Sequence, residues 1–183
     1  HLTLDITALS HDGRGIARLA PVDDRTSKGT VVFVANALPG QRVKAQVLRR
    51  KSSFIEAEAA ALLSQSPDAV DPICPHHAEC GGCPLQTMPY AQQLFWKRTL
   101  ALDALARIGK FDRDQIESLL PPVAGSPAQT RFRNKMEFAF GHTPDNKADL
   151  KLGLRRRNGR DVVPVPHCAL MPPDALQIVD MLG

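Results

Sequence analysis

The residues of this chain most able to do chemistry are its four cysteines, Cys74, Cys80, Cys83 and Cys168. Three of them lie within ten residues of each other, and the fourth follows much later in the chain. Thiolates in this number predict one metal site, and two kinds of centre stay open, a structural zinc ion and a 4Fe–4S cluster. Zinc sites usually pair two short Cys-x2-Cys units, whereas three grouped ligands with a remote fourth suit a cubane, whose irons occupy separate corners. Disulfides would need an oxidising compartment, which nothing in the sequence indicates.

The residues around these cysteines add to the case for a cluster. Gly81 and Gly82 would let the backbone approach a cluster closely and donate N–H bonds to its sulfurs. His76 and His77 lie between the first two cysteines, but beside four thiolates we expect them to be solvent-exposed loop residues. Either metal would tie the loop at residues 74–83 to the segment around Cys168, as a staple for a module with a thin core.

Positive charge is concentrated in two parts of the chain. The net charge is +4, but residues 131–160 alone contain nine Lys or Arg and three Asp or Glu. Residues 42–51 contain five basic residues and no acidic one. Such concentrations are typical of a surface that binds a polyanion, although a solvated basic face without a partner would explain the charge about equally well.

The composition favours a soluble globular protein. The chain has 183 residues, of which 43% are hydrophobic and 23% charged, and this length fits one large domain or two small ones. No apolar run approaches the ~18 residues that a membrane-spanning helix needs, and the alternating N-terminus is unlike a signal peptide. We therefore expect a cytoplasmic protein, or part of one, that is monomeric and has no membrane partner.

The predicted fold class is α+β, and mostly β at the N-terminus. Residues 2–64 contain five short alternating or β-branched runs, near 2–6, 15–19, 31–35, 42–48 and 54–60. Turn signals separate these runs, among them Asp12-Gly13, a polar stretch at 23–29 and Leu38-Pro39-Gly40. Five such strands predict a small closed or nearly closed β-barrel over residues 1–64, and the Pro- and Ser-rich residues 65–73 predict a linker.

The segment after the cysteine loop is predicted to begin with helices and return to strands. One helix would run from a cap near Thr87 to Gly109, and a second from a cap at Asp112 to Leu119. Alternation over residues 131–140 predicts a strand with aromatic residues and Met136 on its core face and basic residues on the other. The runs at 150–155 and 161–165 flank Asn158-Gly159, which predicts an antiparallel hairpin with arginines at its tip. Residues 173–182 predict a short helix.

Several of these segments resemble one enzyme family. The run Cys74-Pro-His-His-Ala-Glu-Cys-Gly-Gly-Cys-Pro-Leu-Gln86, followed by Tyr90-x2-Gln93-x3-Lys97, is similar to the iron–sulfur segment of bacterial RNA uracil-5-methyltransferases. Residues 131–140 resemble the first strand of that family's central domain, and Cys168 matches its remote fourth ligand. Asp12-Gly-Arg-Gly-Ile-Ala, Val32-Phe-Val and Leu38-Pro-Gly40 resemble motifs of a TRAM domain, an oligonucleotide-binding β-barrel. Barrel and cysteines together resemble the 23S ribosomal RNA enzymes more than the transfer RNA enzymes.

The resemblance implies a domain organisation and a cofactor. It implies an OB-like TRAM barrel at residues 1–64, a linker at 65–73, and an iron–sulfur segment with part of a central RNA-binding domain at 74–183. The ligands of the 4Fe–4S cluster would be Cys74, Cys80, Cys83 and Cys168, with zinc as the alternative metal.

The resemblance also implies what this chain lacks. The family transfers a methyl group from S-adenosylmethionine to C5 of uracil, with a cysteine nucleophile and a carboxylate base in a C-terminal Rossmann-like domain. This chain has no glycine-rich turn between a strand and a helix and no fifth cysteine. We therefore expect an N-terminal portion that recognises 23S rRNA and is inactive alone, with S-adenosylmethionine bound only in the missing domain. The alternatives are a stand-alone zinc or iron–sulfur RNA-binding module and a redox protein.

Two groups of basic residues are predicted to contact RNA. On the barrel, the basic run would follow a single strand, with Phe54 as a possible stacking ring, although core packing is the favoured role for Phe54. In the later segment, guanidinium groups would hold phosphates or stack on splayed bases. The predicted RNA-binding residues are Arg42, Lys44 and Arg50 in the barrel, and Arg131, Arg133, Lys135, Arg155, Arg156 and Arg157 in the later segment.

Overall fold

The computed structural model describes residues 1–20, 29–146, 148–157 and 159–182. Contacts divide the chain into two compact units, residues 1–70 with 87–124, and residues 71–86 with 125–183. The first unit contains a large sheet and two helices, and the second contains the four cysteines, a small sheet and one helix. The mixed α+β class, dominated by sheet, is therefore confirmed.

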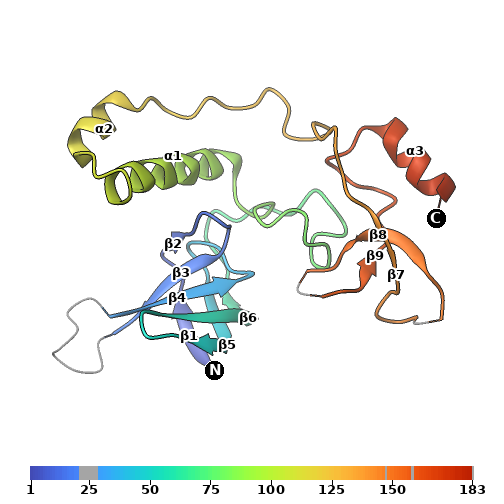
Figure 1. Ribbon diagram of the computed structural model, residues 1–183, viewed down its shortest axis with the longest axis horizontal. Helices are drawn as coiled ribbons and strands as arrows, with labels where there is room; N and C mark the ends of the chain where they lie inside the picture. Colours follow the sequence, from blue (N-terminus) through green and yellow to red (C-terminus); the bar gives the residue numbers. More distant parts are fainter. Residues whose placement is uncertain (21–28, 147, 158, 183) are drawn as a thin grey trace. The chain divides into compact units, whose positions relative to one another are not determined.

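The large sheet has six strands and curls on itself (Figure 1). They are β1 (Leu2–Asp5), β2 (Ala8–Leu9), β3 (Gly15–Leu19), β4 (Thr30–Ala35), β5 (Arg42–Arg50) and β6 (Phe54–Ser64), in the order β1-β5-β6-β4-β3-β2. All neighbours are antiparallel except β4 and β6. Only residues 6–7 separate the two edge strands, so the edges of the sheet come together in one segment of the chain.

The prediction of a five-stranded barrel is confirmed only in part. The first predicted strand is split into β1 and β2, and the described residues contain a curled sheet without a ladder between these two strands. Backbone hydrogen bonds hold the two residues between these strands: Ile6 N–H donates to the Gln41 carbonyl and Thr7 N–H donates to the Ile16 carbonyl. A bend of this kind lets one short run of residues pair with two different neighbours.

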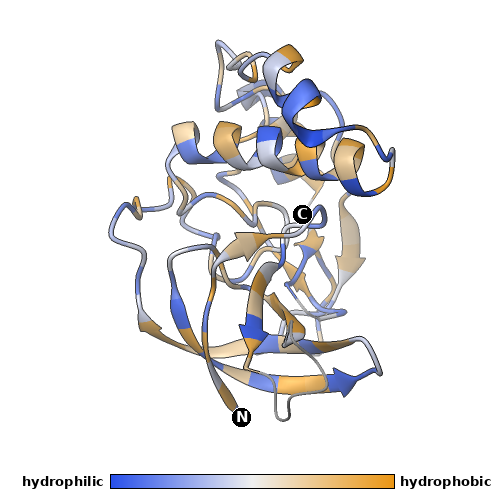
Figure 2. Cartoon of the chain, turned by 90° about the vertical axis from the view of Figure 1, so that its left-hand side faces the viewer, coloured by the Kyte–Doolittle hydropathy of each residue, from blue (hydrophilic) through white to orange (hydrophobic). Residues whose placement is uncertain are grey.

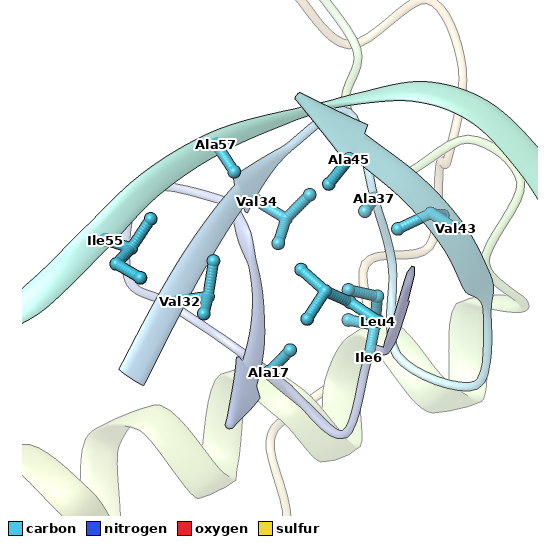
Figure 3. Close-up of a cluster of buried hydrophobic side chains, with 10 residues drawn as sticks. All are labelled: Leu4, Ile6, Ala17, Val32, Val34, Ala37, Val43, Ala45, Ile55 and Ala57. Carbon is cyan, nitrogen blue, oxygen red and sulfur yellow. The ribbon is translucent and has the colours of Figure 1, made fainter. Parts of the chain in front are cut away.

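The core of the first unit lies inside the curled sheet. Alternate residues of β4 and β6 point inward, and Val32 and Val34 are fully buried. In Figure 2 the strands accordingly change between hydrophilic and hydrophobic colours along their length. Burying a Val or Ile side chain stabilises the fold by about 1.5–3 kcal/mol, so this cluster is the main source of stability that the sheet has. Figure 3 shows its ten members pointing toward one another: Leu4, Ile6, Ala17, Val32, Val34, Ala37, Val43, Ala45, Ile55 and Ala57.

A tight turn before β3 is held by Asp12. The hydroxyl of Ser10 donates to the Asp12 carboxylate, and the Arg14 guanidinium lies 2.8 Å from it, while Gly13 supplies the left-handed φ of 84° that the turn needs. Burial raises the pKa of Asp12, but the hydrogen bonds from Ser10 and Arg14 and the charge of Arg14 outweigh it and hold the pKa below the ordinary 3.8.

Replacing Asp12 by asparagine is therefore expected to lower the free energy of unfolding by less than about 1 kcal/mol at neutral pH, because the carboxylate is largely exposed. A lowered folded-state pKa contributes stability above the unfolded-state pKa and loses it as pH falls through the folded-state value. The difference between Asp12→Asn and the parent chain should thus shrink below pH 3.8. Urea unfolding at a series of pH values measures it, and a difference that stays constant down to the lowest pH would contradict the assignment.

Two helices complete the first unit, α1 (Tyr90–Arg107) and α2 (Arg113–Leu119). The predicted cap of α2 is confirmed, since the Asp112 carboxylate accepts from Gln115 N–H at 3.0 Å. The predicted cap of α1 is wrong: the helix begins after Pro89 and has no side-chain cap, because proline supplies a suitable φ without needing a partner for an N–H. No helix among the described residues is long and apolar enough to cross a membrane.

The second unit contains a three-stranded antiparallel sheet and one helix. Its strands are β7 (Ala139–Gly141), β8 (Lys151–Arg155) and β9 (Val162–Val163), and the helix is α3 (Pro173–Leu182), as predicted. The predicted hairpin is confirmed by the pairing of Leu154 with Val163. Asn158 of its expected turn lies outside the described residues.

The predicted strand at residues 131–140 is largely wrong. Only its end, in β7, is a strand, and Arg131 at its predicted start adopts a left-handed φ of 55°. Arg131 and Arg133 instead donate their N–H groups to the carbonyls of Ala169 and Leu170. The two predicted faces fail with it, since Phe132 is 56% exposed while Arg133 is half-buried.

Candidate metal centre and nucleic-acid interface

The first three cysteines lie in a loop built from short turns. His77 N–H donates to the Cys74 carbonyl, and the N–H groups of Glu79 and Cys80 both donate to the His76 carbonyl. These bonds fold the backbone back on itself between Cys74 and Cys80, and both cysteines are 8% exposed. The loop therefore presents two buried thiols on a short, internally bonded backbone.

The loop is attached to the β8–β9 hairpin of the same unit. Cys80 and Arg156 form an isolated antiparallel bridge, and Gly81 N–H donates to the Arg155 carbonyl at 3.3 Å. Cys168 lies next to the loop cysteines, and the two residues after it accept backbone hydrogen bonds from residues 131 and 133. Cys168 packs against Leu170 and Met171, with Met136 and the half-buried Cys83 beside them.

These contacts bring the four cysteines around one cavity. It is lined by all four of them together with His77, Gly82, Gln86, Arg133, Met136, Leu154, Val165, Ala169 and Leu170. None of the four forms a disulfide. Among the described residues, however, no group of three His, Cys, Asp or Glu side chains is arranged to hold a single metal ion. All four cysteines thus line one shared space.

Hydrogen bonds and charges around the cavity suit sulfur ligands. Gly82 N–H donates to the Cys80 sulfur at 3.4 Å, and the Gln86 side chain accepts from Cys74 N–H at 3.2 Å. Burial raises the pKa of the Cys83 thiol above its ordinary value, and the neighbouring Cys80 and Cys168 thiols add to the rise. A hydrogen bond with Gln86 and the charge of Arg133 partly oppose it. Arg133 is therefore a cation close to the thiols.

The two histidines of the loop are less exposed than expected. Both are half-buried, and the His76 Nε2 and His77 Nδ1 atoms are buried without a hydrogen-bond partner. Burial lowers the pKa of His77, and the Arg157 charge lowers it further. The prediction of solvent-exposed loop residues is wrong for both, because the arginine-rich hairpin covers the loop.

The basic residues of the second unit fall into two groups. Arg131, Lys135 and Arg155 are exposed, although Lys135 pairs with Glu137 at 3.0 Å. Arg133, Arg156 and Arg157 are half-buried. Arg133 lines the cysteine cavity, Arg156 lies 3.8 Å from Glu79, and Arg157 donates to carbonyls of the loop. Spacing alone could not separate the groups, since all lie in one basic stretch of the sequence.

The basic residues of the first unit lie on the outside of its sheet. Arg42, Lys44 and Arg50 are exposed on β5, and Arg42 lies 3.6 Å from Asp5. Phe54 is only partly buried and is not a member of the core, so the favoured role in core packing is wrong. Its ring packs edge to face on Phe33, with centroids 5.4 Å apart.

Each of these two rings is also covered by a cation. The Arg14 guanidinium lies 4.9 Å from the centroid of Phe33, and the Lys51 ammonium lies 4.8 Å from that of Phe54. We name Arg14, Phe33, Lys51 and Phe54 the aromatic–cation surface. Sequence reasoning missed Phe33 and Arg14; the outward position of Phe33 between buried Val32 and Val34 was the available signal.

Comparison with known proteins places these features among RNA methyltransferases. Residues 1–60 match the TRAM domain family. The chain is 41% identical over 97% of its length to an uncharacterised RNA methyltransferase of Nitratidesulfovibrio vulgaris, covering 36% of that protein. It is 34% identical over 97% of its length to 23S rRNA (uracil(1939)-C(5))-methyltransferase RlmD of Alkalilimnicola ehrlichii, covering 37% of it. The chain thus spans about a third of the length of these relatives.

A solved structure has a similar fold. The tRNA (uracil-54, C5)-methyltransferase of Pyrococcus abyssi, in complex with S-adenosyl-L-homocysteine, matches 99% of this chain with a TM-score of 0.58 and 22% identity, over 35% of its own length. The TRAM match and the curated relatives confirm the predicted resemblance to RNA uracil-5-methyltransferases of 23S rRNA.

Proposed function

We propose that this chain is the RNA-recognition portion of an S-adenosylmethionine-dependent methyltransferase that makes 5-methyluridine in 23S rRNA. The observation that carries the proposal is the 34–41% identity to RNA methyltransferases over nearly the whole chain, which includes both units. Methyl transfer itself would depend on groups outside these residues. All four cysteines of the chain line one buried cavity, which leaves none as the nucleophile that attacks uracil.

The proposed metal centre is a 4Fe–4S cluster held by Cys74, Cys80, Cys83 and Cys168. A single zinc ion needs its four sulfurs at about 2.3 Å from one point, in tetrahedral geometry. A cubane instead takes one thiolate at each of four irons, so its ligands surround a space, as these four cysteines do. The cluster would supply a covalent cross-link between the loop, the hairpin and the segment around Cys168, and iron and sulfide analysis separates it from zinc.

The proposed RNA contacts are the exposed basic residues. On the first unit these are Lys44 and Arg50 with the aromatic–cation surface, where bases would stack on partly exposed rings and cations would meet phosphates. On the second unit they are Arg131 and Arg155. The half-buried Arg133, Arg156 and Arg157 were predicted to contact RNA as well, but their contacts with the cysteine loop favour a role at the metal centre.

The test of this proposal is RNA binding and methylation by the purified chain. We expect it to bind single-stranded RNA with an affinity that falls steeply as salt rises, and to transfer no methyl group from S-adenosylmethionine. Arg131→Ala should reduce the slope of log affinity against log salt by about 1, since one phosphate contact is lost. Fluorescence anisotropy over a salt series measures the slope, and Glu137→Gln, an exposed charge change in the same segment, is the control.

A further inference from the structure

Arg157 makes a set of contacts that no other arginine of the hairpin makes. One terminal nitrogen of its guanidinium donates to the His77 carbonyl at 3.1 Å and to the Cys80 carbonyl at 3.3 Å. Its backbone N–H donates to the Glu79 carbonyl at 2.7 Å. One residue of the hairpin therefore binds three loop carbonyls, that of the second cysteine and those of two residues just before it.

These bonds complete the immobilisation of Cys80. The N–H of Cys80 donates to the His76 carbonyl, its backbone is bridged to Arg156, and its carbonyl accepts from Arg157. The backbone N–H and the carbonyl of Cys80 are thus both hydrogen-bonded, and its side chain, 8% exposed, projects from a fixed backbone. Metal ligands held in this way keep their geometry before the metal arrives.

The charge of Arg157 acts in the same sense. A guanidinium stays protonated at all physiological pH values, and an assembly of four thiolates around a cluster favours a nearby cation. The guanidinium also donates hydrogen bonds to the His77 and Cys80 carbonyls, so both oxygens point toward it.

The neighbouring arginines provide the contrast. Arg155 and Arg160 are exposed, and the Arg155 guanidinium donates to the Arg160 carbonyl within the hairpin. Arg156 reaches only an exposed carboxylate of the loop, that of Glu79 at 3.8 Å. Arg157 thus differs from these neighbours in that its guanidinium donates to backbone carbonyls of the loop.

We propose that Arg157 is a positioning residue of the metal centre, whose guanidinium clamps the His77 and Cys80 carbonyls and thereby fixes the cysteine loop for the cluster, and that it does not contact RNA. The inference rests on the proposed metal centre, because it assigns Arg157 a role in keeping the cluster bound.

The test compares Arg157→Gln and Arg157→Lys with Arg160→Gln in the full 183-residue chain. Arg160→Gln removes the same charge from the same hairpin without touching the loop, so it is the matched control. Each protein is reconstituted with iron and sulfide without oxygen, and the rate of iron loss to a ferrous chelator is followed by visible absorption. Amide hydrogen exchange at Cys80 and Gly81 reports the order of the loop independently of the metal.

Loss of these hydrogen bonds should speed iron release about tenfold or more, because residues that support metal ligands typically change metal affinity by that much. We expect Arg157→Gln to release iron at least tenfold faster than the parent chain, with faster exchange at Cys80 and Gly81, and Arg157→Lys to lie between them. Arg160→Gln should release iron at the parental rate and show parental exchange at Cys80 and Gly81.

Three results would overturn the inference in distinguishable ways. Parental iron release by Arg157→Gln, in a chain that does bind iron, would overturn the clamp and leave the metal centre standing. A parent chain that takes up neither iron nor zinc would overturn the metal centre itself, and the assignment of Arg157 with it. A shallower salt slope in Arg157→Gln at full iron content would return this residue to the RNA-binding surface.

Discussion

Replacing Cys83 by serine is expected to remove most of the iron from the chain and to unfold much of its second unit. Cys83 is one of four thiols around the cavity, and serine is a poor ligand for the iron of a cluster. The second unit has little else to hold it together, because its buried clusters contain only a few residues each and include the cysteines themselves. Metal binding of this kind contributes about 10 kcal/mol or more to folding in small thiolate sites.

The first unit should survive this change. Its core contains no cysteine and lies wholly inside the large sheet. Thermal unfolding of Cys83→Ser should therefore show one transition close to the parental one and the loss or broadening of a second. Iron and sulfide analysis gives the metal content, and Glu137→Gln, an exposed side chain of the same unit outside the cavity, is the control. Full iron content in Cys83→Ser would contradict the proposed ligand set.

The second large effect is expected on RNA binding, in the double variant Phe33→Leu, Phe54→Leu. Stacking of one base on an aromatic ring is worth about 1–3 kcal/mol, or roughly 5- to 150-fold in affinity. Leucine keeps most of the apolar surface on the sheet and removes the planar face of the ring. We therefore expect affinity for single-stranded RNA to fall at least fivefold, with a nearly unchanged salt slope, since no charge is lost.

A matched control comes from the same unit. Phe95 on α1 is 61% exposed and no cation of the described residues lies over its ring, so Phe95→Leu changes an exposed ring outside the aromatic–cation surface. Anisotropy with a labelled RNA measures the affinities, and thermal unfolding shows whether the edge-to-face pair was needed for stability. Parental affinity in the double variant would mean that the two rings serve only to pack against each other.

The N-terminal sheet could be predicted because a single rule decides it. Each of its strands has one face toward the core, and inward residues therefore alternate with outward ones. The rule holds even for β6, whose alanines and glutamates favour a helix, since Ile55 and Ala57 are buried and Glu56 and Glu58 are not. The split between β1 and β2 could not be predicted, because it depends on which two strands the first segment meets.

The second unit shows where alternation fails. Residues 131–140 alternate as well as any strand of the sheet, yet Arg131 takes a left-handed φ and the next residues bond to residues 169–170. That choice depends on a segment far away in the sequence. The grouping of the four cysteines was anticipated from their spacing, but the direction of each arginine was not. Arg157 and Arg160 are the same residue type in one hairpin, yet the first is half-buried with its guanidinium on the loop and the second is exposed.

The short segment that supplies both edge strands of the large sheet has a consequence for solubility. β1 covers residues 42–45 of β5, and β2 covers Gly15 and Ile16 of β3. Unpaired edge strands offer rows of N–H and C=O groups to other chains and promote aggregation. Because residues 2–9 cover both β5 and β3, a cut or a strained fusion there would expose unpaired N–H and C=O groups on both strands at once. The first nine residues thus limit the backbone that this sheet offers for pairing with other copies of the chain.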